Sequence, residues 1–283
     1  MTAVDFAGET TEMSDLVWPE RATEQAAEYF NAAKKELELF HFIVGTIVHI
    51  DFVAYKAKRA LEEDEKMQEE DSYESPEDPI KEPNDLLKSN PGEATRALRR
   101  SRQELLELFL GRSVDNFQTY VVSIIRAALR KQPKILSDSK YELDVKSILD
   151  HASIESLLYD LVERKVDDLS YRGFEDLQSW CLKHGIPLTA PTGKLAEVIE
   201  LIATRNLIGH NRGVVDQKYL RIAKASRFQA GERRKLKPDE LFAAIALLGQ
   251  IVEATDRAVA TSFGLEILPL EKLDKTEEQR PMR

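Results

Sequence analysis

The sequence predicts an all-α protein, a helical bundle with a long N-terminal helix. Three observations support this fold class. Apolar residues recur at spacings of three and four along most of the chain, no segment shows the alternation of a half-buried strand, and no internal repeat is present. The chain has 283 residues, of which 42% are hydrophobic, enough to fill the core of a bundle.

Residues 18–62 are expected to form the first helix, after a flexible tail over residues 1–17. Proline at position 19, followed by Glu20, is typical of a first helical turn. A helix of this length is longer than most globular helices, so we expect it to pack on the bundle or on a dimer partner. Its most apolar stretch, 37–55, contains two histidines and two acids, so no membrane span is expected.

Residues 63–92 are expected to form an acidic, disordered linker between two antiparallel helices. Glu62 to Asp85 carries twelve acids against two lysines, a local charge of −10, and prolines recur through the segment. Such low hydrophobicity and high charge do not support a packed core. The alternative is an acidic arm that competes with a polyanion for a basic surface.

Residues 93–265 are expected to form the bundle itself. Helical patterns cover 93–131, 153–165, 170–183, 195–208 and 238–263, with a short helix or turn at 214–225 and a basic loop at 228–237. Pro133 ends the first of these helices, Ser153 is a candidate N-cap of the second, and Gly185 occupies the left-handed cap position after the third. Residues 266–283 are expected to form a polar tail.

Composition excludes several classes of protein. The net charge of −10 argues against a general nucleic-acid coat protein. Cys181 is the only cysteine, so neither a disulfide nor a cysteine-rich zinc site forms within one chain, and a reducing compartment is expected. The acidic N-terminus has no apolar signal core. We therefore expect a cytoplasmic protein without a metal or cofactor.

One short segment carries the candidate chemistry. Residues 205–213 read Arg-Asn-Leu-Ile-Gly-His-Asn-Arg-Gly, at the end of an apolar helical run. Arg205 is a permanent cation suited to phosphate, Asn206 both donates and accepts hydrogen bonds, and histidine, here His210, exchanges protons near neutral pH. Such a set suits a site that holds a phosphate and moves a proton beside it.

The spacing of these residues adds a constraint. At about 100° per residue, Asn206 and His210 lie one above the other on a helix, whereas Arg205 and His210 point roughly 140° apart. Either the helix loosens at Gly209, or Arg205 reaches round on its long stem. The alternative is a structural helix end, in which the arginine pairs with an acid and the other two side chains cap carbonyl groups.

Residues 205–237 are strongly basic. They contain ten arginines and lysines against two acids, a local charge of +8. This segment is either a landing surface for a polyanion beside the motif or a solvated basic face.

The string Arg-Asn-x-x-x-His, followed by Asn-x-Gly-x-Val-Asp-x-x-Tyr, resembles the signature of the HEPN superfamily (higher eukaryotes and prokaryotes nucleotide-binding). The matching positions are Arg205, Asn206, His210, Asn211, Gly213, Val215, Asp216 and Tyr219. The resemblance covers about 195–220, with a weaker helical match back to about 95. It implies an all-α, HEPN-like bundle, usually a homodimer and often a metal-independent endoribonuclease in defence, toxin or stress-response systems.

The resemblance also implies roles for individual residues. Arg205, Asn206 and His210 would form the catalytic set of a composite site at a dimer interface. The expected RNA-binding residues around it are Asn211, Arg212, Lys218, Arg221, Arg233 and Arg234. The implied partners are an RNA substrate, a second copy and a possible regulatory protein. HEPN relatives without catalytic activity exist, so a partner- or nucleotide-binding protein is the alternative function.

Overall fold

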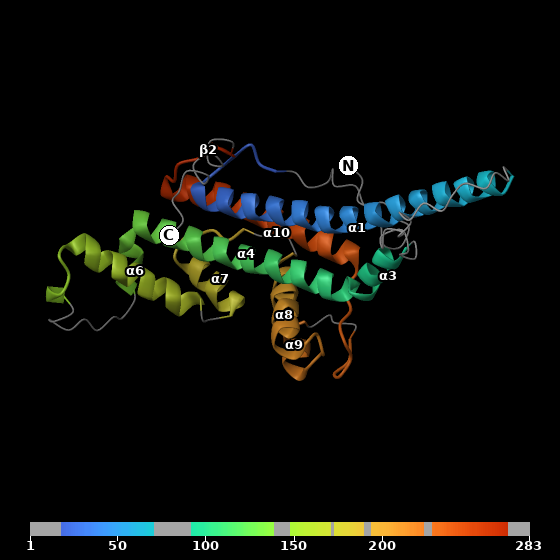
Figure 1. Cartoon of the computed structure of the whole chain (residues 1–283). Helices are drawn as coiled ribbons and strands as arrows, with labels where there is room; N and C mark the ends of the chain where they lie inside the picture. The colour runs from blue at the N-terminus through green and yellow to red at the C-terminus, as the bar shows by residue number, and fades with distance from the viewer. Residues whose placement is uncertain are drawn as a thin grey trace. The chain divides into compact units, whose positions relative to one another are not determined.

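The computed structural model describes residues 18–70, 92–138, 148–170, 173–189, 194–223 and 228–270, and it confirms the all-α fold with a long N-terminal helix (Figure 1). The α-helices of these residues are α1 (Glu24–Glu70), α3 (Glu93–Arg100), α4 (Arg102–Lys131), α6 (Ile154–Ser170), α7 (Phe174–Lys183), α8 (Leu195–Asn211), α9 (Gln217–Ile222) and α10 (Pro238–Phe263). A 3₁₀ helix, η2 (Pro133–Asp138), and two short strands, β1 (Arg21–Ala22) and β2 (Leu268–Pro269), complete the described elements.

The chain divides into two compact units. The smaller unit contains α1 from Glu36 onward, α3 and the first turn of α4. The larger unit contains the start of α1 and the described residues from Glu107 onward, including the motif helix α8.

In the smaller unit, α1 supplies the N-terminal cap of α3. The residue before α3 is Gly92, which has no side chain to accept the free N–H groups of the first turn. The carboxylate of Asp51 takes this role: its oxygens accept hydrogen bonds from the backbone N–H groups of Ala94 (3.2 Å) and Thr95 (2.7 Å). Desolvation alone would raise the pKa of Asp51, but these hydrogen bonds outweigh it and lower the pKa below its usual value.

Asp51→Ala is expected to loosen the first turn of α3. Loss of an N-cap costs about 0.5–2 kcal/mol, so exchange of the Ala94 and Thr95 amide hydrogens should accelerate by up to roughly thirtyfold. Because the pKa of Asp51 is lowered on folding, its contribution is present above the unfolded pKa and is lost as pH falls through the folded pKa. Hydrogen exchange checks this, with His49→Ala on the same helix as the control; unchanged exchange in Asp51→Ala contradicts it.

The core of the larger unit lies between α4, α10 and the start of α1, which Figure 1 shows side by side. The hydroxyl of Tyr120 on α4 donates to the carbonyl of Val252 on α10 (3.3 Å), and the Tyr29 ring of α1 lies 6.1 Å from the Tyr120 ring. The apolar face of α4 is fully or nearly fully buried from end to end. Its buried residues in this unit are Phe109, Leu110, Val114, Phe117, Tyr120, Val121, Ile124, Ile125, Ala128 and Leu129.

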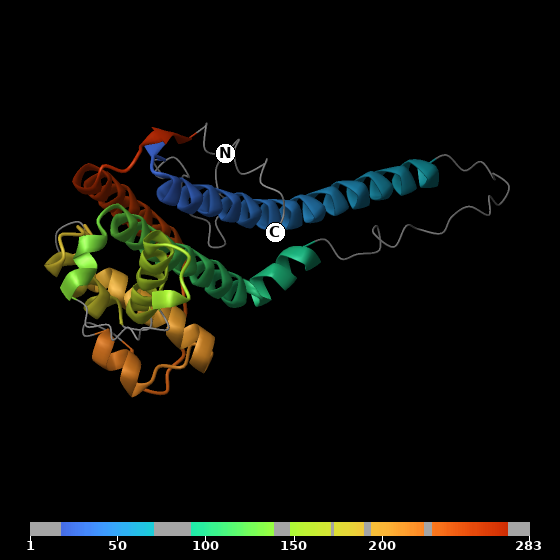
Figure 2. The ribbon, with the colours of Figure 1, turned by 90° about the vertical axis from the view of Figure 1, so that its left-hand side faces the viewer.

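The start of α1 is tied to α10 by a buried polar contact. The backbone N–H of Thr23 donates to Asp256 (3.0 Å), as does its hydroxyl (2.5 Å), while the same hydroxyl caps the N–H of Ala26 (3.3 Å). Burial raises the pKa of Asp256, and the Thr23 hydrogen bonds partly oppose this shift. Strands β1 and β2 pair antiparallel beside this contact (Figure 2).

Several helix signals are confirmed. Ser153 caps α6, because its hydroxyl accepts the N–H of Ser156 (3.2 Å). Gly185 follows α7 with a φ of 73°, and Pro238 is the first residue of α10. Pro133 is the first residue of η2, two residues past the end of α4.

Some predicted boundaries are wrong. The first helix begins at Glu24 rather than near residue 18, because Arg21 and Ala22 pair with β2, which lies inside the predicted polar tail. It also continues to Glu70, so residues 63–70 of the predicted linker are helical. Ser101 separates α3 from α4 where one helix was expected. The predicted tail 1–17, residues 71–91 of the linker and residues 271–283 lie outside the described residues.

By length and composition, one described helical segment passes a test for membrane crossing. It is Glu24–Ala57, 34 residues long, within which an 18-residue stretch has a mean hydropathy of 1.6. Core helices of soluble proteins pass the same test, so the segment is weak support for a membrane span.

Candidate functional site

Helix α8 remains regular through the whole motif. It runs to Asn211, three residues beyond the predicted end, and it does not loosen at Gly209. Arg212 ends the helix in the left-handed conformation (φ 51°), and the Leu207 carbonyl accepts the N–H groups of both Arg212 and Gly213. Glycine or asparagine is usual at such a position, so an arginine there is conformationally costly.

Asn206 and His210 lie on one exposed face of α8, as the spacing predicted. Neither side chain is packed into the core. Within the described part of the chain, His210 makes no ring contact, ion pair or hydrogen bond that would fix it in a structural role. An exposed imidazole at a helix end is accessible to a ligand.

Arg205 turns away from the histidine toward α4. Its Nε atom lies 2.7 Å from a carboxylate oxygen of Asp115, and its Nη1 donates to the side-chain oxygen of Asn206 (3.2 Å). The structure therefore brings Arg205 together with Asn206 but not with His210. Of the five N–H donors of a guanidinium, two are used in this way, which leaves three for a ligand.

The motif residues after His210 form a compact turn. The Asn211 side-chain amide donates to the Val214 carbonyl (2.5 Å), and Gly213 has a φ of 75°, a conformation that favours glycine. A Cβ at Gly213 would lie 3.5 Å from a carboxylate oxygen of Glu107, in ordinary van der Waals contact. The backbone carbonyl of Gly213 accepts the backbone N–H of Arg234 (2.9 Å), and this hydrogen bond joins the turn to the 228–237 loop.

The remaining motif positions start and anchor α9. Val215 is buried, and its backbone N–H donates to the backbone carbonyl of Glu232 (2.8 Å). Asp216 caps α9 by accepting the N–H of Tyr219 (2.7 Å). The later positions of the string that carries the HEPN resemblance thus act as a scaffold, which leaves Asn206 and His210 facing solvent, with Arg212 also exposed at the end of α8.

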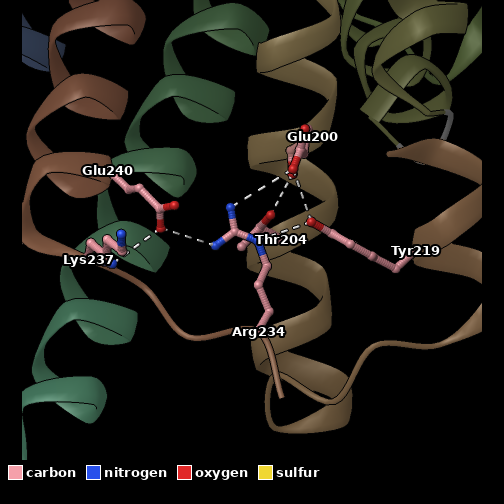
Figure 3. Close-up of polar contacts among 6 residues, drawn as sticks. All are labelled: Glu200, Thr204, Tyr219, Arg234, Lys237 and Glu240. Carbon is pink, nitrogen blue, oxygen red and sulfur yellow. Dashed lines mark hydrogen bonds and ion pairs between the residues drawn. The ribbon is translucent and has the colours of Figure 1, made fainter. Parts of the chain in front are cut away.

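A buried polar cluster holds the basic loop against α8 and α9 (Figure 3). The hydroxyl of Tyr219 accepts from Arg234 Nε (3.0 Å) and donates to a Glu200 carboxylate oxygen (3.2 Å). A Glu240 carboxylate oxygen lies 3.8 Å from Arg234 Nη1 and accepts the backbone N–H of Lys237 (3.2 Å). The prediction that Arg234 is a surface contact to RNA is corrected here, since its side chain is only 9% exposed.

The other predicted RNA-binding residues differ in whether they are exposed and whether they pair with an acid. Arg212, Lys218 and Arg221 are exposed on the turn and on α9. Arg233 is 44% exposed but is paired with Glu107 of α4 (3.2 Å). The exposed cations of the basic segment that no described acid pairs with therefore include Arg212, Lys218 and Arg221, and the Lys224 and Arg227 positions lie outside the described residues.

Two acids of α4 are functional candidates that the sequence did not indicate. Asp115 meets Arg205 and Glu107 meets Arg233, so each acid pairs with a cation of the basic segment. The two acids lie eight residues apart, on nearby faces of α4. Nothing in the local pattern around residue 115 links it to residue 205, so only the packing of α4 near α8 reveals the pair.

Asp115→Asn tests whether this acid orients Arg205 for a phosphate. The pair is partly exposed, so its net strength is only about 0–1 kcal/mol, and a phosphate can compete for the guanidinium. If the protein cleaves RNA, as the HEPN resemblance implies, removing one negative charge should lower KM for RNA a few-fold, whereas loss of the ionic anchor should lower kcat about tenfold.

Steady-state cleavage kinetics measure this split, with Asp167→Asn on α6 as a control of equal charge change. If KM and kcat change in the same way in Asp115→Asn and Asp167→Asn, Asp115 contributes only to the overall electrostatic field of the protein.

No group of three or more His, Cys, Asp or Glu residues in the described ranges is placed to hold a metal ion. His41, for example, uses its Nδ1 in a contact with the Leu37 carbonyl (2.6 Å).

Comparison with known proteins adds no relative. No protein-family model matches the sequence, and the searches of curated proteins and of solved structures return no match either.

Proposed function

We propose that the protein is a metal-independent endoribonuclease of the HEPN type. The observation that carries the proposal is the exposed pair of Asn206 and His210 on one face of α8. Three exposed cations, Arg212, Lys218 and Arg221, follow within eleven residues of the histidine. An exposed imidazole followed closely in the chain by exposed cations suits acid–base chemistry on a phosphodiester.

The reaction would proceed by attack of a ribose 2′-hydroxyl on the adjacent phosphorus. A bond forms between O2′ and phosphorus and the bond from phosphorus to O5′ breaks, which leaves a 2′,3′-cyclic phosphate and a 5′-hydroxyl. One proton leaves the 2′-hydroxyl and one reaches the departing O5′. His210 would carry one of these transfers, and the charge that develops on the phosphate oxygens would be stabilised by Arg205.

A second copy of the chain would complete the site. One imidazole serves as either acid or base at a given step, and the reaction needs both. Two copies related by a twofold axis would supply two His210 side chains to one groove. The proposal includes a homodimer, RNA as its substrate, a regulatory protein as a further partner and a cytoplasmic location.

One observation favours the alternative, a non-catalytic protein that binds a partner or a nucleotide through the same surface. Arg205 is bonded to Asp115 and Asn206, about 140° around a straight helix from His210. For catalysis, its remaining donors must reach a phosphate that His210 also contacts. Binding alone needs no such convergence.

RNA and DNA of the same sequence separate the two functions. The full chain should cleave the RNA and leave the DNA intact, because only RNA carries the attacking hydroxyl. Binding of both without cleavage of either, in the presence and absence of added proteins from the source cell, would favour the non-catalytic alternative.

A further inference from the structure

One side of α1 in the smaller unit exposes large apolar side chains to solvent. The exposed fractions are 51% for Leu39, 69% for Phe42, 47% for Ile50 and 50% for Val53. The buried residues of the same part of the helix are Leu37, Phe40 and Val44, which lie roughly 150° around the helix axis. The helix therefore has apolar residues on two sides. The side of Leu37, Phe40 and Val44 is covered there and exposes Phe52 and Tyr55 further along, whereas the other side is uncovered along its length.

The uncovered face has the spacing of a helix–helix seam. Leu39, Ile43, Thr46, Ile50, Val53 and Ala57 are separated alternately by four and three residues, and all six are exposed or half-buried. We call these six residues the α1 stripe. An amphipathic helix that packs on a globular core has a wider stripe of period 3.6, whereas alternating spacings of three and four are typical of two helices wound around each other.

The chemistry of the stripe also suits a pair of helices. In this register Ile43, Ile50 and Ala57 take the a positions and Leu39, Thr46 and Val53 the d positions. Isoleucine at a and leucine at d are the residues that favour two strands, and Ile43, Ile50 and Leu39 follow that choice. The stripe spans about 27 Å of helix, which is long enough for nearly three heptads.

The exposed area approaches what a weak dimer needs. If a large apolar side chain offers about 200 Å², Leu39, Phe42, Ile50 and Val53 together leave roughly 400 Å² uncovered per copy. A monomer rarely exposes a larger contiguous apolar patch without a function. Two such faces, with the half-buried Ile43 and Ala57 at their margins, approach the total of about 1,000 Å² expected for a specific interface.

We propose that the α1 stripe is the surface through which two copies of this chain associate. A twofold axis brings the same surface of both copies together, so one stripe supplies both halves of the interface and both are covered at once. A lipid bilayer is the less suitable partner, because Leu37, Phe40 and Val44 on another side of α1 are buried in the fold and Asp51 is bonded to α3. The inference depends on exposure and spacing and does not require RNA cleavage.

Sedimentation velocity of the full chain tests the association. Between about 1 and 100 µM, the range suited to an interface of this size, the wild type should shift from monomer to dimer. The double variant Ile50→Glu/Val53→Glu places two carboxylates in the seam and should raise the dimer Kd at least about tenfold. Circular dichroism should show the same helix content, because both positions are half-exposed in the single chain.

Phe52→Glu is the matched control. Phe52 is 54% exposed on the same helix but lies well off the stripe, and the Lys56 ammonium sits 5.6 Å from its ring centre. This variant should dimerise like the wild type.

A wild type that stays monomeric at 100 µM, or equal loss of dimer in Phe52→Glu, overturns the proposal. So does a monomer that binds phosphatidylcholine vesicles through Ile50 and Val53, since the partner would then be a membrane. A dimer that depends on the stripe but does not cleave RNA upholds this inference and removes only the proposed function.

Discussion

His210→Ala is expected to abolish RNA cleavage while leaving the fold intact. A positioned acid or base contributes about a hundred- to ten-thousandfold to a rate, and a loss in this range should appear in kcat because the imidazole acts in the transition state. The side chain is exposed and, among the described residues, holds no structural contact, so the melting temperature should change little.

The matched control is His151→Ala. His151 is half-buried on the larger unit, with its Nε2 atom 3.5 Å from Asp160, and it is not part of the motif. Cleavage should persist in this variant. If His210→Ala cleaves RNA at the wild-type rate, His210 is neither the acid nor the base, and the cleavage depends on other residues.

Arg205→Ala should produce the second large effect. A cation that stabilises developing charge on a phosphate contributes about a hundred- to thousandfold to kcat. Arg205→Lys keeps the charge but loses the planar fork that serves Asp115, Asn206 and a phosphate together. Its rate should therefore fall between those of the wild type and the alanine variant.

If Arg205 has only a structural role, we expect a different pattern of activities and stabilities among the variants. If Arg205 only pairs α8 with α4, Arg205→Ala should behave like Asp115→Ala in both activity and thermal stability. The double variant would then add little to either single change. Cleavage kinetics and melting temperatures of Arg205→Ala, Asp115→Ala and the double variant distinguish a catalytic role of Arg205 from a purely structural one.

The fold was predictable where one apolar period governs a long segment. Helix α10 begins at Pro238 and ends before Gly264, at both positions where the residue types indicate it. The strands β1 and β2 were not predictable, because two residues cannot show alternation. Helix α1 outruns its apolar pattern to Glu70, which shows that acidic composition alone does not mark where a helix ends.

The candidate site was predictable in its local part only. The four-residue spacing of Asn206 and His210 places them on one face, and α8 confirms this. The contacts of Arg205 with Asp115, and of Arg234 with Tyr219 and Glu200, depend on how distant helices pack. Charge counts along the sequence therefore overstated the basic surface, because buried or paired arginines contribute little to it.

The most direct measurement of the central claim is the chemistry of the cleaved ends. A defined RNA should be incubated with the full chain in excess chelator, beside a copy that carries a 2′-O-methyl group at each cleaved position. The account predicts 2′,3′-cyclic phosphate and 5′-hydroxyl ends by mass spectrometry, and no cleavage at the methylated positions. Ends with a 3′-hydroxyl and a 5′-phosphate, or cleavage that requires added metal, would contradict it.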